Sequence, residues 1–182
     1  MLKLAAALLG IAVASAMPAG AQPAGIGGGF SLTEAPDRAV SDADFRGKYL
    51  LVFFGYTNCP DLCPATLGKI AAALRMMGSR AAQIQAVFIT LDPARDTPAV
   101  MAQYVALFSP DMIGLSGTAG QIAAVERGYH VYVGPRDAKT GAIAHSAILY
   151  VMRPDGGFAS ALPDDISAES LAESLLKLTS AR

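Results

Sequence analysis

The sequence is poor in cysteine and histidine, with two of each among 182 residues. Two cysteines are too few for a domain held together by a framework of disulfides. The 14 basic and 15 acidic residues nearly balance, and no cluster of lysine and arginine suggests a nucleic-acid surface. No internal repeat or low-complexity tract interrupts the main part of the chain. These absences leave an ordinary globular domain whose rare cysteines and histidines need an explanation.

The first 21 residues have the pattern of an export signal. Lys3 precedes an apolar stretch at residues 4–16, and the small residues 19–21 fit a cleavage site before Gln22. The apolar stretch has 13 residues, too few to span a bilayer comfortably. The alternative is an uncleaved segment that anchors the protein in the membrane. No cysteine lies near the cleavage site, so a lipid-modified N-terminus is not indicated. We therefore expect export, to the periplasm of a bacterium.

Removal of residues 1–21 would leave 161 of the 182, enough for one domain with a proper core. Residues 22–29, rich in glycine, read as a flexible linker. Residues 30–182 are then expected to form one α/β domain. Strands are expected at residues 30–32, 39–41, 49–56, 85–91, 112–115, 129–133, 147–152 and 158–162, and helices at 65–77, 97–108, 118–127 and 167–178. The first two strands would form an N-terminal β-hairpin, and the others a central mixed sheet flanked by helices.

The two cysteines, Cys59 and Cys63, follow the apolar run 49–56 at a junction between a strand and a helix. Residues at i and i+4 of a helix lie on one face, with Cα atoms about 6 Å apart, so the pair can form a disulfide or bind one soft metal ion. A purely structural disulfide is less attractive because so short a loop constrains little of the unfolded chain. Reactive cysteines at the start of the helix after a central strand indicate a thioredoxin-like fold.

Copper bound by two thiolates would accept imidazole as a third ligand. His145 stands directly before the expected strand 147–152, in a loop that faces the cysteine helix in a thioredoxin-like sheet, and is the favoured candidate. His130 lies within the expected strand 129–133 and is interpreted as a structural or surface residue. Met76 and Met77 lie more than three turns beyond Cys63 and are not expected to be ligands.

Residues 91–98 form a second polar segment, at the carboxyl end of the strand 85–91. Asp96 or Thr97 can cap the following helix, and Pro98 suits its first position. The same edge of an α/β sheet is where such folds place their sites. Asp61, between the cysteines, is a turn residue or a contact for a partner protein.

Three separate motifs in the right order resemble the Sco/SenC family: residues 55–64 around the cysteines, residues 91–98, and the pair 145–146 before a strand. Residues 30–32 and 44–48 also match, so the resemblance covers nearly the whole domain. It implies a thioredoxin-like copper metallochaperone for the CuA centre of cytochrome c oxidase, binding one Cu(I) or Cu(II) ion. The implied ligands are Cys59, Cys63 and His145.

The chain departs from the family pattern at two positions. Ala144 stands where an acidic residue often precedes the histidine, and Asn58 where a histidine often precedes the first cysteine. Neither departure removes a ligand, although the first can alter copper affinity. The partners implied are the CuA-bearing subunit of the oxidase and another periplasmic copper chaperone or thiol reductant.

Two alternatives remain open at this point. In the first, the domain is a thiol–disulfide oxidoreductase in which Cys59 attacks and Cys63 resolves the mixed disulfide. In the second, suggested by Thr57, it is a peroxiredoxin-like peroxidase, although no arginine flanks the cysteines. The loop at residues 134–141 is a candidate surface for a partner.

Overall fold

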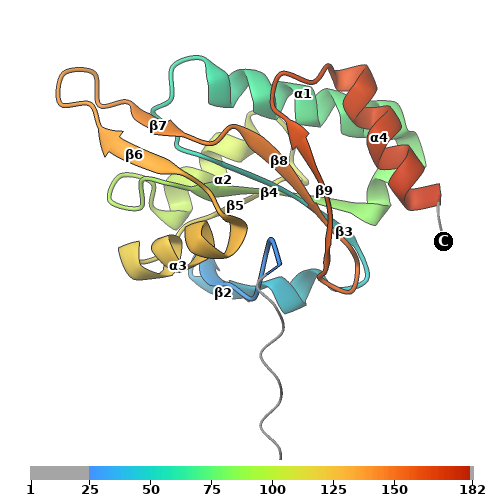
Figure 1. Cartoon of the computed structure of the whole chain (residues 1–182), viewed down its shortest axis with the longest axis horizontal. Coiled ribbons are helices and arrows are strands. Elements are labelled where there is room, and N and C mark those ends of the chain that lie inside the picture. The colour runs from blue at the N-terminus through green and yellow to red at the C-terminus, as the bar shows by residue number, and fades with distance from the viewer. Residues whose placement is uncertain (1–24, 181–182) are drawn as a thin grey trace, which may run out of the picture.

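The computed structural model describes residues 25–180 and centres on a five-stranded mixed sheet (Figure 1). The strand order is β5-β4-β3-β8-β9. Strands β3, β4 and β5 are parallel, whereas β8 is antiparallel to both β3 and β9. The bounds are β3 Tyr49–Gly55, β4 Ile84–Thr90, β5 Ile113–Leu115, β8 Ile148–Met152 and β9 Phe158–Pro163. Because β3 is the central strand, the segment that directly follows it lies near the middle of one end of the sheet.

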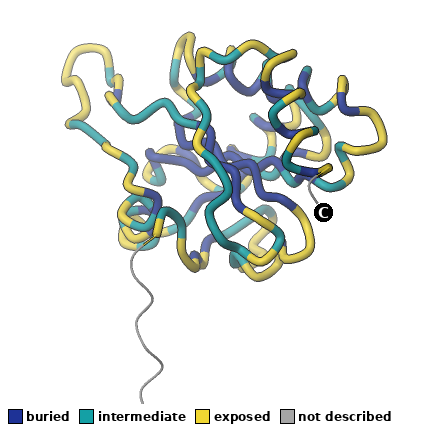
Figure 2. Tube along the Cα trace, turned by 45° about the vertical axis from the view of Figure 1, so that its right-hand side comes forward, coloured by how far each residue is buried: buried dark blue, intermediate teal, exposed yellow. Residues whose placement is uncertain are grey.

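Helices cover both faces of the sheet. Helices α1 (Leu62–Met77), α2 (Pro98–Ala106) and α4 (Ala168–Ser180) pack on one face, and α3 (Ala119–Tyr129) packs on the other. Successive residues of β3 alternate between the two cores: Leu51 and Phe53 face α1 and α4, whereas Val52 and Phe54 face α3. All of β3 is buried, as expected for a central strand covered on both sides (Figure 2).

Two small antiparallel ribbons complete the fold. The N-terminal hairpin pairs β1 (Ser31–Glu34) with β2 (Arg38–Ser41), followed by the 3₁₀ helix η1 (Asp42–Phe45). The second ribbon pairs β6 (Val133–Arg136) with β7 (Ile143–His145). This ribbon projects at the upper left of Figure 1. A second 3₁₀ helix, η2 (Gly78–Gln83), connects α1 to β4.

The helix starts follow local capping rules. The Thr97 hydroxyl accepts a hydrogen bond from the Val100 amide, and Pro98 occupies the first helical position. The Ser167 hydroxyl does the same for the Ser170 amide at the start of α4. Pro64 lies in the first turn of α1, where a missing N–H costs nothing. These features confirm what the sequence predicted locally.

The expected strand at 129–133 is wrong except at its last residue, Val133, where β6 begins. Helix α3 continues to Tyr129, and His130 caps it in a left-handed conformation with φ 55°. Tyr129 is buried with Ile122 and Val125, one helical face, and its ring contacts Phe54 at 5.3 Å between centroids. This packing decides between helix and strand. The short strand β7, at Ile143–His145, was not predicted because three residues carry no periodicity.

The packed domain begins earlier than residue 30. Ile26 packs against the core on the α3 side, and the Gly27 amide donates to Gly128 O at 2.8 Å. The predicted signal at residues 1–21 and the first part of the predicted linker lie outside the described residues. Between residues 25 and 180 no helix is both long and apolar enough to cross a membrane.

Candidate metal centre

Cys63 packs against the C-terminal end of strand β3. Cys63 is in the first turn of α1 and has no exposed surface. A Cβ atom at Gly55 would lie only 2.6 Å from the Cys63 sulfur and 2.9 Å from the Phe88 ring. Only a residue without a side chain allows the sulfur to come this close to the strand. Gly55 is therefore part of what positions Cys63.

Cys59 lies in the loop between β3 and α1, three residues before the helix begins, and so not on a helical face shared with Cys63 as the i and i+4 spacing predicted. Both cysteines are free thiols, and the Cys59 sulfur accepts a hydrogen bond from the Cys63 amide at 3.4 Å. Burial raises the pKa of the Cys63 thiol, although the Tyr56 backbone amide acts in the opposite direction. Without a metal, Cys63 therefore holds its proton at neutral pH and must release it to become a ligand.

His145, half-buried at the end of β7, has one ring nitrogen committed and one available. Its Nδ1 lies 2.9 Å from the Ser146 carbonyl oxygen. A carbonyl can only accept, so Nδ1 carries the proton and donates, and Nε2 keeps its lone pair. This arrangement, in which one nitrogen is oriented by a backbone carbonyl, is typical of histidine ligands.

Tyr56 contacts both parts of the site. Its ring meets the His145 ring edge-on at 6.1 Å between centroids, and its hydroxyl accepts from the Ile143 amide at 3.2 Å. The Tyr56 hydroxyl also interacts with Cys59, and burial raises the Tyr56 pKa. Among residues 25–180, no three His, Cys, Asp or Glu side chains gather closely enough to hold a metal ion. Ligation by all three candidates would therefore require His145 to approach the sulfurs.

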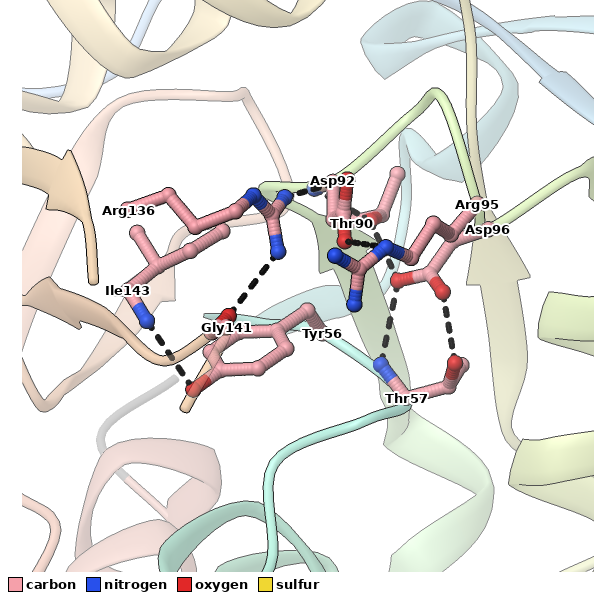
Figure 3. Close-up of polar contacts among 9 residues, drawn as sticks. All are labelled: Tyr56, Thr57, Thr90, Asp92, Arg95, Asp96, Arg136, Gly141 and Ile143. Atoms are coloured by element: carbon pink, nitrogen blue, oxygen red, sulfur yellow. Dashed lines mark hydrogen bonds and ion pairs between the residues drawn. The ribbon is translucent and has the colours of Figure 1, made fainter. Parts of the chain in front are cut away.

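Asp96, fully buried, anchors the cysteine loop (Figure 3). Its carboxylate accepts from the Thr57 amide at 3.0 Å and from the Thr57 hydroxyl at 2.5 Å. The Thr90 hydroxyl at the end of β4 donates to it as well, at 2.7 Å. The Thr57 hydroxyl is thus committed to Asp96 and is not free to activate a peroxide, which argues against a peroxidase.

Asp92, 3% exposed, anchors the β6–β7 ribbon (Figure 3). Arg136 on β6 forms an ion pair with it at 2.6 Å and also donates to the Gly141 carbonyl at 2.9 Å. Arg95 approaches the same carboxylate at 3.6 Å. The short segment from Asp92 to Asp96 therefore connects the loop that carries Cys59 to the ribbon that ends in His145.

Comparison with known proteins identifies the family to which the chain belongs. The SCO1/SenC family model matches residues 18–180. The chain belongs to the SCO1/SenC family. It is 42% identical over 153 residues to the mitochondrial SCO2 homolog of Bos taurus, covering 81% of this chain and 58% of the relative. It is 40% identical to SenC of Rhodobacter capsulatus over 159 residues, covering 86% and 72% respectively.

The fold is that of solved family members. The copper-bound ScoI of Bradyrhizobium japonicum superposes with a TM-score of 0.76 at 43% identity, covering 84% of this chain and 98% of that structure. The thioredoxin-like fold predicted from the sequence is confirmed. The chain spans less than two thirds of the length of the mitochondrial SCO2 relatives it matches.

The SCO1/SenC membership leaves the individual ligands to be judged from the geometry. Cys59 and Cys63 lie together. His145 contacts the ring of Tyr56, and the Tyr56 hydroxyl in turn interacts with Cys59. His130 is exposed at the end of α3, and Asp61 is exposed without a capping hydrogen bond. Met76 is 53% exposed and Met77 is buried in the core, consistent with neither being a ligand.

Sequence reasoning missed three contributors to the site. It offered Asp96 or Thr97 as the helix cap; Thr97 takes that role, and Asp96 holds the cysteine loop, a role that was not predicted. It gave Tyr56 no role beyond the strand, and it placed Arg136 in a solvated loop. Two aspartates directly after a buried strand were the available signal, because such residues seldom become buried without a partner.

Proposed function

We propose that this chain is a copper-binding metallochaperone that delivers copper to, or prepares the thiols of, the CuA centre of cytochrome c oxidase. The observation that carries the proposal is the pair of free thiols, Cys59 in the loop before α1 and buried Cys63 in its first turn, with a histidine nearby whose Nε2 is available. Thiolate and imidazole are the donors that copper prefers. Cys59, Cys63 and His145 would bind one ion, as Cu(I) or Cu(II).

Relatives support this proposal. The Bradyrhizobium protein was solved with copper bound, and so was yeast Sco1, which is 32% identical to this chain with a TM-score of 0.79. The export signal predicted at residues 1–21 would fit delivery of copper outside the cytoplasm. We propose the periplasm as the location, with the oxidase subunit that carries CuA and another copper chaperone or a thiol reductant as partners.

The two cysteines and the two buried aspartates would have different roles in binding the copper ion. Cys63, buried and held beside Gly55, would be the inner ligand, and half-exposed Cys59 the one reached first from solvent. Binding would displace the Cys63 proton, so uptake of the ion releases acid. Asp96 keeps the cysteine loop in place during the exchange, and Asp92 holds the ribbon that brings His145 towards it.

Anaerobic copper titration of the reduced protein tests the proposal. Wild type is expected to bind one equivalent, and His145→Ala to bind it at least tenfold more weakly and with altered thiolate-to-Cu(II) absorption, because the imidazole is lost. His130→Ala is the matched control, because this second histidine is exposed at the end of α3, and it is expected to behave as wild type. Identical titrations for wild type and His145→Ala would remove His145 from the site.

A second candidate function is thiol–disulfide exchange with the oxidase subunit. The observation that favours it is the difference in exposure between Cys59, which a partner can reach, and Cys63, which has no exposed surface. The Cys59 thiolate would attack a partner disulfide and release one partner thiolate. The Cys63 thiolate would then attack the Cys59 sulfur, release the second partner thiolate and leave the domain oxidised by two electrons.

Arrest of this sequence after its first step is the test. Cys63→Ser is expected to accumulate a covalent mixed disulfide with an oxidised CuA-bearing fragment, visible by mass spectrometry under non-reducing conditions. Cys59→Ser serves as the comparison, since it lacks the attacking sulfur. Equal trapping by both variants, or none by either, would contradict an oxidoreductase role with these assignments.

A further inference from the structure

Ser146, the residue after His145, pairs with the facing strand in an unusual way. In the register of the β6–β7 ribbon, Val133 lies opposite His145. The next pair along the ribbon is therefore Tyr132 and Ser146. Facing residues in a hydrogen-bonded antiparallel pair normally exchange two bonds, each from a backbone amide to a backbone carbonyl. Only one of the two is present here, from the Ser146 amide to the Tyr132 carbonyl oxygen at 2.9 Å.

The serine side chain takes the place of the second bond. The Tyr132 amide donates to the Ser146 hydroxyl oxygen at 3.0 Å, instead of to the Ser146 carbonyl oxygen. Serine hydroxyls can substitute in this way for a nearby backbone acceptor. The Ser146 carbonyl is thereby left for His145, whose Nδ1 lies 2.9 Å from its oxygen. Ser146 thus uses its amide and hydroxyl to hold its own position against Tyr132, and its carbonyl to hold the imidazole.

This use of the carbonyl determines which nitrogen of the His145 ring is available. A neutral imidazole carries one proton, and the nitrogen that lacks it is the one that can bind a metal. A carbonyl oxygen beside Nδ1 favours the proton on Nδ1 and leaves the Nε2 lone pair free. The Tyr56 ring meets the imidazole edge-on at 6.1 Å between centroids, so the ring is held by a second neighbour as well.

We infer that Ser146 is a positioning residue for His145. Its hydroxyl replaces its own carbonyl in the pairing with Tyr132, so that the carbonyl holds the imidazole in the tautomer with a free Nε2. The inference rests on the proposed copper site for its biological use. The hydrogen bonds themselves belong to the metal-free protein, so they can be tested without copper.

Ser146→Ala removes the hydroxyl and keeps the carbonyl. The Tyr132 amide is then expected to turn to that carbonyl and complete the regular pair, which weakens its bond to His145 Nδ1. Nitrogen NMR of the isotope-labelled, reduced and metal-free protein distinguishes protonated from unprotonated ring nitrogens, at about pH 8.5 where an ordinary imidazole is neutral. We expect a protonated Nδ1 and an unprotonated Nε2 at His145 in wild type, and a shift towards protonated Nε2 in Ser146→Ala.

Two comparisons make this measurement specific. Ser146→Thr keeps the hydroxyl and is expected to keep the wild-type tautomer. His130, exposed at the end of α3, is the internal reference and should give the same signals in every variant. Identical His145 signals in wild type and Ser146→Ala, or a proton on Nε2 in wild type, would overturn the inference.

Copper titration gives a second readout. Ser146→Ala is expected to bind copper about tenfold more weakly and with a shifted thiolate-to-Cu(II) absorption band. Ser174→Ala is the matched control, because the Ser174 hydroxyl bonds within its own helix, to the Ser170 carbonyl oxygen at 2.8 Å. Unchanged copper binding in Ser146→Ala would contradict the positioning role. If wild type binds no copper, the metallochaperone proposal fails, and the NMR comparison alone decides whether Ser146 sets the His145 tautomer.

Discussion

Replacing Gly55 by alanine is expected to destabilise the domain by about 2–3 kcal/mol and to weaken copper binding at least tenfold. The new methyl group would lie 2.6 Å from the Cys63 sulfur and 2.9 Å from a carbon of the Phe88 ring. Both neighbours are fully buried, so neither can turn into solvent to make room. Overpacking of this kind forces shifts in the surrounding side chains or backbone. Urea unfolding of the metal-free protein and anaerobic copper titration measure the two effects.

Gly68→Ala provides the matched control for this substitution. Gly68 lies inside α1, and a Cβ there meets no atom within 4 Å. Alanine is preferred to glycine in a helix by up to about 1 kcal/mol, so this variant should be slightly more stable than wild type and bind copper normally. Stability of Gly55→Ala within about 0.5 kcal/mol of wild type, together with normal copper binding, would contradict the close approach of Cys63 to β3.

Asp96→Ala is expected to lower the free energy of unfolding by about 3–5 kcal/mol. The substitution leaves three donors without their acceptor: the Thr57 amide, the Thr57 hydroxyl and the Thr90 hydroxyl. It also frees the loop that carries Cys59, so copper affinity should fall together with stability. Urea unfolding gives the first quantity, and hydrogen exchange at the Thr57 amide reports the release of the loop directly.

Asp96→Asn keeps the shape of the side chain and covers the case in which the alanine variant does not fold. Its amide group retains one acceptor oxygen but replaces the other with a donor, so an intermediate loss of stability is expected. Asp61→Ala is the control, because Asp61 is an exposed acid in the same loop without a capping hydrogen bond, and it should change stability by less than about 0.5 kcal/mol. Equal stability of Asp61→Ala and Asp96→Ala would show that the buried carboxylate does not anchor the loop.

Local patterns were enough to predict several elements. The unbroken apolar run around Phe53 predicted a strand covered on both faces, and β3 is buried at every residue. The pair Thr97 and Pro98 predicted the start of α2, because a capping hydroxyl and a proline act within one turn. Helix and strand were confused at Tyr129, whose neighbours in sequence suit either structure and whose burial against Phe54 comes from another part of the chain.

The sequence by itself predicted the donor atoms of the candidate site and the strand–helix junction that carries the two cysteines, because both depend on local sequence. The i and i+4 spacing also predicted that the cysteines share a helical face, but α1 begins at Leu62 and Cys59 lies in the loop before it. Only the tertiary structure decided how those atoms are supported. Thr57 and Asp96 are 39 residues apart, and Tyr56 and Ile143 are 87 apart. These contacts exist because β3 lies between β4 and β8, so their connecting segments meet at one sheet edge. Such long-range contacts depend on strand order, and strand order is set by the packing of the whole domain.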